Sequence, residues 1–542
     1  MRNVHRRLMH KTVNAFRGMV SSPHHLASEA GLAILREGGS AVEAVVATAA
    51  CLCVVYPHMC GLGGDAFWTL YDPASGRVTC IDAAGHSGLH VHGEYLKKRG
   101  HTAIPRRGPQ AMLTCAGAVS GWQRVLETAT GRDKPLPLSR LFADAIHYAE
   151  QGYPVSAGQA SLIKSNLDEL GEQPGFSDQF LHNGSSPVCN QRQTLPALAN
   201  TFKRLAREGL DSFYRGKLAE TLAAELAVLG SPLVLDDLKT QQARVLAPLV
   251  AEVSGARLYN CPPPSQGVAS LMILGIYDAL TGADAQRRQD GLPLVHGLVE
   301  STKRAFAWRD AHVADAAHMR EEVAKWLTPE ALKEQASGIR ADSVLPWGAD
   351  KGAGDTVWLG AVDAAGRVVS CIQSIYFEFG TGVVLPETGI TWHNRGLGFS
   401  LRENHPNCLG PRKRPFHTLN PALAVFADGR VMAYGSMGGE GQPQTQSALF
   451  SRYAWLGYDL QEAISAPRWV MGRTWGENST SLKVEAAFTE DILHGLQTLG
   501  HTLEVVPACN ELMGHAGAVV KHANGLLQGA TDPRSDGAVA AF

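Results

Sequence analysis

The stretch ADKGAGDTVWLGAVDAAGRVVS, Ala349 to Ser370, changes character at the pair Asp355-Thr356. Before the pair, Gly, Ala and Asp dominate without periodicity, which is typical of an exposed connection, and we place this connection at 338–355. After the pair, TVWLGAV and RVVSCIQSI alternate or run apolar around the turn DAAGR, and this pattern predicts a β-hairpin. Thr356 is thus the first residue of a predicted strand, directly after an exposed segment.

Thr356 at the start of a strand has two interpretations. β-Branched residues favour strands, so the threonine can serve the sheet alone. Alternatively, its hydroxyl attacks the carbonyl of Asp355, the resulting ester hydrolyses, and Thr356 becomes a new N-terminus. The freed α-amino group titrates at about 7.7–8.0 and can act as general base toward the hydroxyl of the same residue. Autocleavage at an exposed Asp355-Thr356 bond would therefore create an N-terminal threonine nucleophile.

The segment YGSMGGEGQ, 434–442, contains two adjacent glycines, Gly438 and Gly439. Their bare amides can be presented to a developing oxyanion without obstruction by side chains. A double glycine is also common in ordinary turns. These residues alone leave both interpretations open.

The composition is that of a globular protein with a small-molecule partner. The 542 residues are 45% hydrophobic and 18% charged, with a formal net charge of -2 and no long Lys/Arg run, so nothing indicates a nucleic-acid or membrane partner. The longest apolar run, 41–56, contains Glu43 and is shorter than the roughly 20 residues that span a bilayer. The basic N-terminus lacks the apolar run of a secretory signal, and the ten cysteines form no paired CxxC blocks. We therefore expect a cytoplasmic protein with reduced thiols.

Periodicity predicts a mixed α/β chain. Helical spacing predicts helices at 26–37, 41–56, 138–150, 195–208, 217–229, 294–311 and about 441–457, and helical patterns dominate 115–340. Alternating apolar residues predict a hairpin at 65–83 and further strands around 356–375, 422–435 and 517–532. Strands on both sides of the 338–355 connection suggest layered sheets built from both halves of the chain.

Many motifs occur in an order that resembles the gamma-glutamyltranspeptidase family of N-terminal-nucleophile hydrolases. They are GMVSSPHHLASEAGLAILREGGSAVEAVVA, GLGGDAF, PPPSQG, HGLVESTKRAFAWRD, DTVWLGAVDAAGRVVS, FGTGVVLPETGI, KRPFHTLNPAL and GSMGGEGQ. The resemblance implies an αββα sandwich, in which two stacked antiparallel sheets lie between helical layers. It also implies one precursor cut into a large fragment, 1–355, and a small fragment, 356–542, which associate into one structural unit. A dimer of such pairs is left open.

The resemblance also assigns catalytic groups. Thr356 falls at the nucleophile position, Ser374 at the position of a second hydroxyl that hydrogen-bonds the nucleophile, and Gly438-Gly439 at the oxyanion-hole pair. No cofactor is implied. The histidine clusters of the chain lack a spaced carboxylate, so no metal is expected either.

The expected substrate pocket departs from the γ-glutamyl pattern. Ala84 stands at or near the family's arginine that clamps the glutamyl α-carboxylate, and Arg395 and Gly398 replace the Gln and Asp that hold the α-carboxylate and α-amino groups. The other candidate substrate contacts are Tyr376, Asn394, His417 and Thr418. Loss of a carboxylate and gain of an arginine favour a substrate that carries a carboxylate and lacks the amino group. This pattern is similar to the branch that contains oxamate amidohydrolase, and in part to glutaryl and cephalosporin acylases.

Our hypothesis is a self-cleaving amidohydrolase that converts a small carboxylate-bearing amide, with oxamate giving oxalate and ammonia, through an acyl-Thr356 intermediate. The enzyme alternatives are a γ-glutamyl hydrolase or transpeptidase acting on glutathione-like substrates and a glutaryl- or cephalosporin-type acylase. A non-enzymatic alternative is an unprocessed binding or scaffold homologue. Arg395 and His417 also have an interpretation as structural side chains. Val357 and Trp358 stand where the family commonly has Thr and His, which leaves the effect on processing open.

Overall fold

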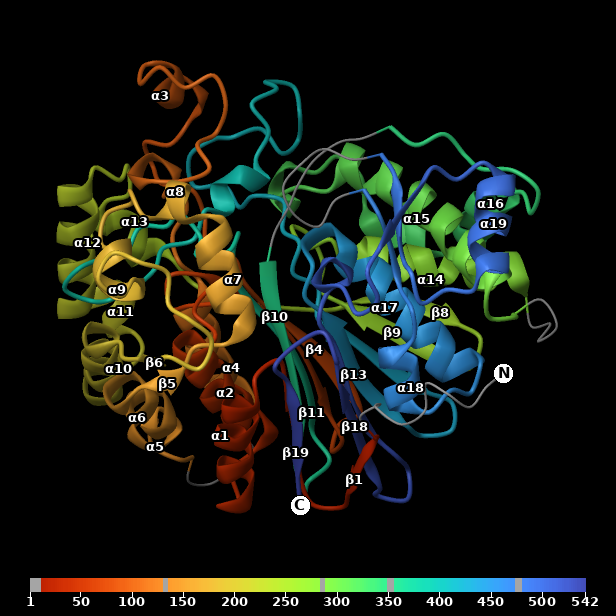
Figure 1. Ribbon diagram of the computed structural model, residues 1–542, viewed down its shortest axis with the longest axis horizontal. Coiled ribbons are helices and arrows are strands. Elements are labelled where there is room, and N and C mark those ends of the chain that lie inside the picture. The colour runs from red at the N-terminus through yellow and green to blue at the C-terminus, as the bar shows by residue number, and fades with distance from the viewer. Residues whose placement is uncertain (1–10, 130–134, 283–287, 349–354, 473–479) are drawn as a thin grey trace.

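Two seven-stranded antiparallel sheets form the centre of the part of the chain that the structure describes (Figure 1). The computed structural model describes residues 11–129, 135–282, 288–348, 355–472 and 480–542. The first sheet has the order β19 (Ala538–Ala541), β2 (Met19–Ser22), β10 (Asp355–Val362), β11 (Val368–Tyr376), β3 (Asp65–Asp72), β4 (Arg77–Ala83) and β7 (Arg244–Leu246). The second has the order β1 (Val13–Ala15), β18 (Leu527–Thr531), β17 (Ala516–Lys521), β13 (Val431–Ser436), β12 (Ala422–Phe426), β9 (Ala256–Asn260) and β8 (Leu249–Val253). Both sheets contain strands from before and after residue 355, which confirms the prediction of sheets built from both halves.

Helices pack on the outer face of each sheet, so the predicted αββα sandwich is confirmed (Figure 1). The core of the first sheet includes α1 (His25–Arg36), α2 (Ala41–Val55), α4 (Ala118–Ala129), α5 (Leu138–Leu141), α6 (Ala143–Gln151), α7 (Ala157–Ser165), α8 (Leu167–Leu170), α9 (Phe176–Phe180), α10 (Pro196–Glu208), α11 (Ser212–Arg215), α12 (Lys217–Leu229) and α13 (Leu235–Thr240). The core of the second includes α14 (Gly267–Thr281), α15 (Leu292–His312), α16 (Pro329–Ser337), α17 (Gln442–Phe450), α18 (Leu460–Ser465) and α19 (Glu490–Leu499). A third core lies between the sheets.

The acidic residue within the longest apolar run is a helix cap. All 15 residues of α2 are buried, and the backbone amide of Ser40 donates to Glu43 Oε2 at 2.7 Å while the Ser40 hydroxyl accepts from the Glu43 amide. The other carboxylate oxygen, Oε1, accepts from the amide of Leu136 at 2.7 Å. The capping box therefore satisfies the buried carboxylate and starts the central helix at the predicted residue.

The structure corrects the sequence interpretation in three places. Strands β7, β8 and β9 lie within 244–260, where helical patterns were expected to dominate. β7 and β8 are edge strands of the first and second sheet, and β9 pairs with β8. The helix predicted at 138–150 is divided at Phe142 into α5 and α6. The helix predicted at 441–457 continues from α17 into a π-helical turn, Ser451–Trp455. In the segment 338–348, exposed residues alternate with partly buried ones and with the buried Ile339, and 349–354 lies outside the described residues.

Trp358 lies between the two sheets in a space left by two glycines. Its indole Nε1 donates to Ser370 Oγ at 3.0 Å. On the facing sheet, Gly435 of β13 pairs with Gly517 of β17, and a Cβ atom on either glycine would lie within 2.3 Å of the indole. The side chain that departs from the family pattern at this position is therefore a packing element of the inter-sheet core, with Val357 in the helical core on the opposite face.

We expect Gly435→Ala to lower stability, because the new methyl carbon would lie 2.0 Å from Trp358 Cδ1 and neither sheet can move without disturbing the core. The loss should be about 1–3 kcal/mol, measured as a lower unfolding temperature or denaturant midpoint. Gly93→Ala is the matched control, since its Cβ would have no heavy atom within 4 Å. Adding Trp358→Leu to Gly435→Ala should recover part of the loss, and equal stability of the two single glycine variants would contradict this packing.

Candidate active site

A bulge between β10 and β11 sets the position of Thr356. The register shifts between Asp355 and Val357, so that Thr356 lies opposite two residues of β11, one of which is Ser374. Bulges of this kind redirect a side chain and are common beside active sites. The expectation that the Asp355-Thr356 bond is exposed is wrong on the threonine side, because Thr356 is 0% exposed. The pairing of β10 with β11 places Thr356 between the two sheets.

Gln442 is the hydrogen-bond donor to the Thr356 hydroxyl. Gln442 Nε2 lies 3.0 Å from Thr356 Oγ1, and Gln442 Oε1 accepts from Asn420 Nδ2 at 2.9 Å. The same Asn420 nitrogen donates to the carbonyl of Thr418 at 2.9 Å. Sequence reasoning did not assign a role to Gln442 or Asn420, although both lie within quoted motifs, because nothing in the local pattern marks an amide as a neighbour of the threonine. Ser374 Oγ accepts from the Tyr376 amide at 2.7 Å.

The double glycine forms a tight turn between β13 and α17. Gly438 and Gly439 have φ values of 124° and 51°, which favour glycine, and Gly439 begins a short 3₁₀ turn. The turn is held through its carbonyl, because Gln266 Nε2 donates to Gly439 O at 2.8 Å and to Thr418 O at 2.7 Å. Among the described residues, neither glycine amide donates to a protein acceptor. The adjoining N-terminus of α17 favours negative charge at the same place.

Arg395 is a buried cation without a carboxylate partner among the described residues. It is 1% exposed, its Cζ lies 3.5 Å from the centre of the Tyr376 ring, and its Nη1 donates to Thr418 Oγ1 at 3.0 Å. Its Nε and Nη2 atoms are buried and have no hydrogen-bond partner in the described part of the chain. Burial lowers the pKa of Arg395, whereas Tyr376 and the nearby carboxylates of Asp65 and Glu440 oppose that shift. A planar anion is the chemical group that would complete this guanidinium.

The glycine at 398 makes room for Arg395. A Cβ atom on Gly398 would lie 2.8 Å from Arg395 Nη2 and 2.6 Å from the carbonyl oxygen of Phe416. An aspartate side chain at this position would therefore collide with the guanidinium. The two departures from the γ-glutamyl pattern therefore depend on each other, because Arg395 fits only where residue 398 has no side chain.

Asp65 and two buried histidines lie beside Arg395. His417 Nε2 lies 3.0 Å from Asp65 Oδ2, and His417 Nδ1 accepts from the amide of Leu419 at 3.3 Å, so both ring nitrogens are used within the protein. His393 Nδ1 lies 3.5 Å from the same carboxylate oxygen. Asp65 Oδ1 accepts from the amides of Gly85 and Gly117, at 2.8 and 3.0 Å. This cluster supports the structural interpretation of His417, and direct contact with substrate stays a prediction.

Asn394 braces the segment that carries Tyr376. Its Oδ1 accepts from the Phe377 amide at 3.1 Å, and its Nδ2 donates to the carbonyl of Arg106 at 3.0 Å. Tyr376 has φ of 79°, a region that residues other than glycine rarely adopt, and its ring stacks on Phe377 with centroids 4.8 Å apart. The strained backbone presents the aromatic ring to Arg395.

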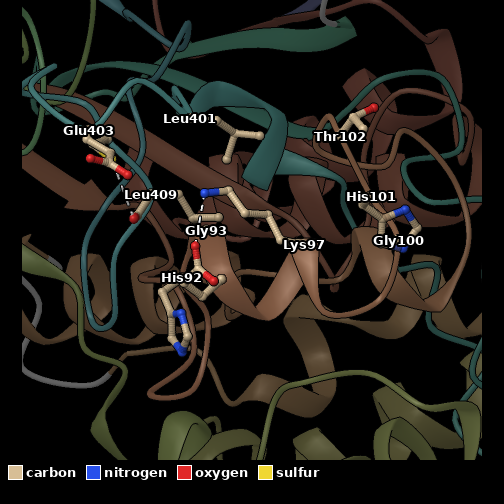
Figure 2. Close-up of a pocket in the computed structure, with 11 residues that line it drawn as sticks. His92, Gly93, Lys97, Gly100, His101, Thr102, Leu401, Glu403 and Leu409 are labelled. Carbon is tan, nitrogen blue, oxygen red and sulfur yellow. Dashed lines mark hydrogen bonds and ion pairs between the residues drawn. The ribbon is translucent and has the colours of Figure 1, made fainter.

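A cavity of about 510 Å³ opens at this cluster, and its lining includes Tyr376, Gly398, Arg309 and Glu440. A second cavity, of about 690 Å³, lies over α3 (Gly93–Lys97) and is shown in Figure 2. Leu401 lines both. The described lining of the second cavity includes no predicted site residue, so the smaller cavity is the candidate substrate entrance.

Comparisons with known proteins identify the family of this chain. The gamma-glutamyltranspeptidase family model matches residues 27–542, and the oxamate amidohydrolase proenzyme of Klebsiella pneumoniae is 55% identical over 98% of this chain and 100% of that protein. The chain belongs to the gamma-glutamyltranspeptidase family. The glutathione hydrolase-like YwrD proenzyme of Bacillus subtilis is 41% identical over 98% of this chain and 99% of that protein. The crystal structure of cephalosporin acylase from Bacillus halodurans matches with a TM-score of 0.89 and 31% identity, over 100% of this chain and 99% of that chain.

The family prediction is thus confirmed, and this member of the gamma-glutamyltranspeptidase family is an N-terminal-nucleophile amidohydrolase. Among the described residues, no helix combines the length and the apolar character needed to cross a membrane.

The buried histidines predict acid sensitivity. Burial, with Arg395 as a further cause, lowers the pKa of His417 to about 4, and burial likewise lowers the pKa of His393 to about 4. The unfolded value is near 6.5, so the stability that these neutral rings contribute is present above pH 6.5 and is lost as pH falls toward 4. Each should cost on the order of 2 kcal/mol between pH 7 and 5. His417→Gln should flatten the fall in unfolding temperature over this range, whereas the exposed His494→Gln should not, and equal slopes in both would contradict the assignment.

Proposed function

We propose that this protein is a self-cleaving amidohydrolase for small amides whose carboxylate lies close to the amide carbonyl, with oxamate as the substrate. The observation that carries the proposal is the buried Arg395 guanidinium, whose Nε and Nη2 lack partners in the described residues. A chain of hydrogen bonds through Thr418, Asn420 and Gln442 connects Arg395 to the Thr356 hydroxyl. The 55% identity to an oxamate amidohydrolase proenzyme supports the same substrate.

The first chemical step in this proposal is cleavage of the Asp355-Thr356 bond by the Thr356 hydroxyl. It would divide the chain into fragments 1–355 and 356–542, which stay associated because strands of both share each sheet. Several relatives are likewise described as proenzymes. We further propose a dimer of these two-fragment units and a cytoplasmic location, which the ten unpaired cysteines support.

Turnover would then use the new N-terminus. The Thr356 hydroxyl attacks the amide carbon of oxamate and passes its proton through the α-amine to the departing nitrogen. The C–N bond breaks, ammonia leaves, and an oxalyl ester remains on Oγ1. Water then attacks the ester carbon, oxalate departs, and the hydroxyl regains its proton. Gly438 and Gly439 amides would stabilise the oxyanion, while Ser374 and Gln442 orient the hydroxyl.

Arg395 would bind the substrate carboxylate through Nε and Nη2, and Tyr376, Asn394, His417 and Thr418 would shape this subsite. Tyr376 and Thr418 contact the guanidinium directly. Asn394 supports the Tyr376 segment, and His417 is fixed by Asp65. A γ-glutamyl substrate is the second candidate because of the 41% identity to a glutathione hydrolase-like protein, and an acylase is the third because of the cephalosporin acylase fold.

Thr356→Ala should leave one uncut chain without amidohydrolase activity, because both cleavage and turnover need the hydroxyl. Intact mass and N-terminal sequencing of the purified protein test this. The unsubstituted chain should give two fragments, the smaller beginning Thr-Val-Trp-Leu. Thr356→Ser, which keeps a hydroxyl, should still be cut. An unsubstituted chain that stays single after long incubation, or an active Thr356→Ala protein, would favour the non-enzymatic alternative.

Arg395→Met should lower kcat/KM for oxamate by at least about 100-fold, since it removes two charge-assisted hydrogen bonds of about 1.5–3 kcal/mol each. Steady-state rates on oxamate, a glutaryl amide and a γ-glutamyl anilide test the substrate class. Arg430→Met, which removes an arginine paired with Asp428 outside the site, is the control. A preference of the unsubstituted enzyme for γ-glutamyl anilide, or an oxamate rate unaffected by Arg395→Met, would contradict this subsite.

A further inference from the structure

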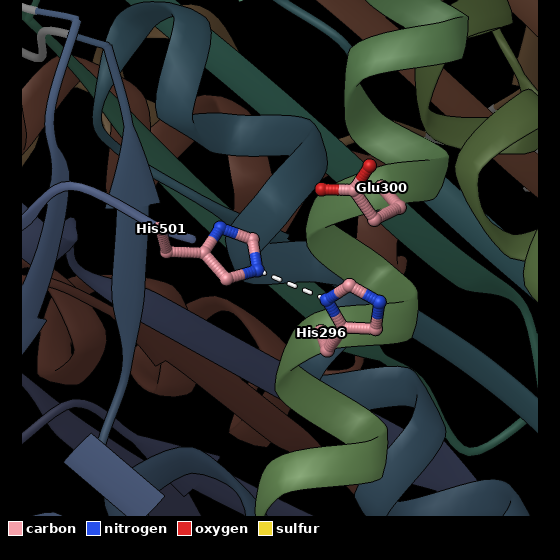
Figure 3. A group of neighbouring side chains, drawn as sticks. All are labelled: His296, Glu300 and His501. Carbon is pink, nitrogen blue, oxygen red and sulfur yellow. Dashed lines mark hydrogen bonds between the residues drawn. The ribbon is translucent and has the colours of Figure 1, made fainter. Parts of the chain in front are cut away.

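Two histidines and a glutamate meet in a buried cluster between α15 and the segment that follows α19 (Figure 3). His296 and Glu300 are four residues apart on α15 and therefore share one face of that helix. His501 follows α19 and points at His296, with 2.9 Å between His296 Nδ1 and His501 Nε2. One ligand atom from each of the three residues lies within 4.8 Å of the others. Neither the proposed catalytic reaction nor the substrate subsite uses this cluster.

The protein already holds the outer atoms of these side chains in the way that metal ligands are held. His296 Nε2 donates to the carbonyl of Arg340 at 2.8 Å, which leaves Nδ1 with a lone pair directed at the cluster. Glu300 Oε2 accepts from the Leu345 amide at 2.7 Å, while Oε1 accepts no hydrogen bond from the described residues. Hydrogen bonds from the second nitrogen of a histidine and the second oxygen of a carboxylate orient ligands in known metal sites.

His501 can supply the third lone pair. In the present arrangement its Nε2–H donates to His296 Nδ1, so a metal ion requires the proton to move to Nδ1 of the same ring. A change of tautomer is therefore all that the ring needs.

We propose that His296 Nδ1, His501 Nε2 and Glu300 Oε1 bind a divalent transition-metal ion of the zinc class, with water as the remaining ligand. Two imidazoles and one carboxylate are a known donor set for zinc. Through Arg340 and Leu345, the ion would fasten the segment 338–348 to α15.

Lys303 is the competitor for the carboxylate. Its Nζ lies 2.7 Å from Glu300 Oε1 and also donates to the carbonyl of Leu345 at 2.8 Å. A divalent ion would replace the ammonium at Oε1, while Lys303 keeps the bond to Leu345. The two cations repel each other at this distance, so removing the lysine charge should strengthen metal binding. A purely structural cluster would show no such effect.

The test is Zn²⁺ binding by the full chain after chelator treatment and dialysis, titrated in competition with a chromophoric chelator. We expect one ion per chain at this site, with affinity at least tenfold lower in His501→Ala and in the milder His501→Gln. Lys303→Met should bind about tenfold more tightly. Co²⁺ in place of Zn²⁺ should give visible absorption typical of a nitrogen and oxygen site of low coordination number, and His501→Gln should remove it.

His494→Ala is the matched control, because His494 is exposed on α19 and lies outside the cluster. Its affinity should equal that of the unsubstituted chain. Absence of stoichiometric binding, equal affinity in His501→Gln and His494→Ala, or weaker binding in Lys303→Met would each overturn the proposal. None of these readouts depends on cleavage at Thr356 or on amidohydrolase activity.

Discussion

The pairing of β10 with β11 is the constraint on which the site depends. Alternate residues of β10 point to opposite faces, so Val357 and Leu359 enter the helical core while Trp358 enters the space between the sheets. A slip of one residue would exchange these faces and bury the indole among helices. The glycine pair opposite Trp358 admits the indole only in the observed register, and the bulge then leaves Thr356 beside Gln442.

Polar groups around Thr356 are buried, and each must therefore be satisfied within the protein. Gln266 shows how one side chain satisfies several of these buried groups. Its side-chain nitrogen donates to the carbonyls of Thr418 and Gly439, and its oxygen accepts from Arg309 Nη1 at 2.9 Å. One amide thus fixes the segment that bears the Arg395 partner and the turn that presents the glycine amides. A rigid arrangement of this kind is what electrostatic stabilisation of a transition state requires.

Much of this architecture could be predicted from the sequence, because it depends on local patterns. Alternating apolar residues predict the hairpin after residue 355. The spacing of Ser40 and Glu43 matches the capping box that starts α2. The edge strands β7 and β8 were missed because short, partly exposed strands carry a weak alternation signal. Gln442 and Asp65 could not be assigned, since their roles come from residues far away along the chain.

The pocket contains a relation between two residues that the sequence alone does not show. In the sequence, Arg395 and Gly398 are two separate departures, whereas in the structure the guanidinium occupies the space that a side chain at 398 would fill. With an arginine in place of an acidic side chain, the pocket would favour a substrate carboxylate over the α-ammonium of a γ-glutamyl group. A buried cation without a carboxylate partner is costly, and an anionic substrate offsets that cost, while an α-ammonium would add to it. The nearby carboxylates cannot readily compensate, because Asp65 is engaged by His417 and two backbone amides, and Glu440 is paired with Arg309 at 3.1 Å. In the proposed subsite, discrimination would therefore rest on charge before any difference in shape.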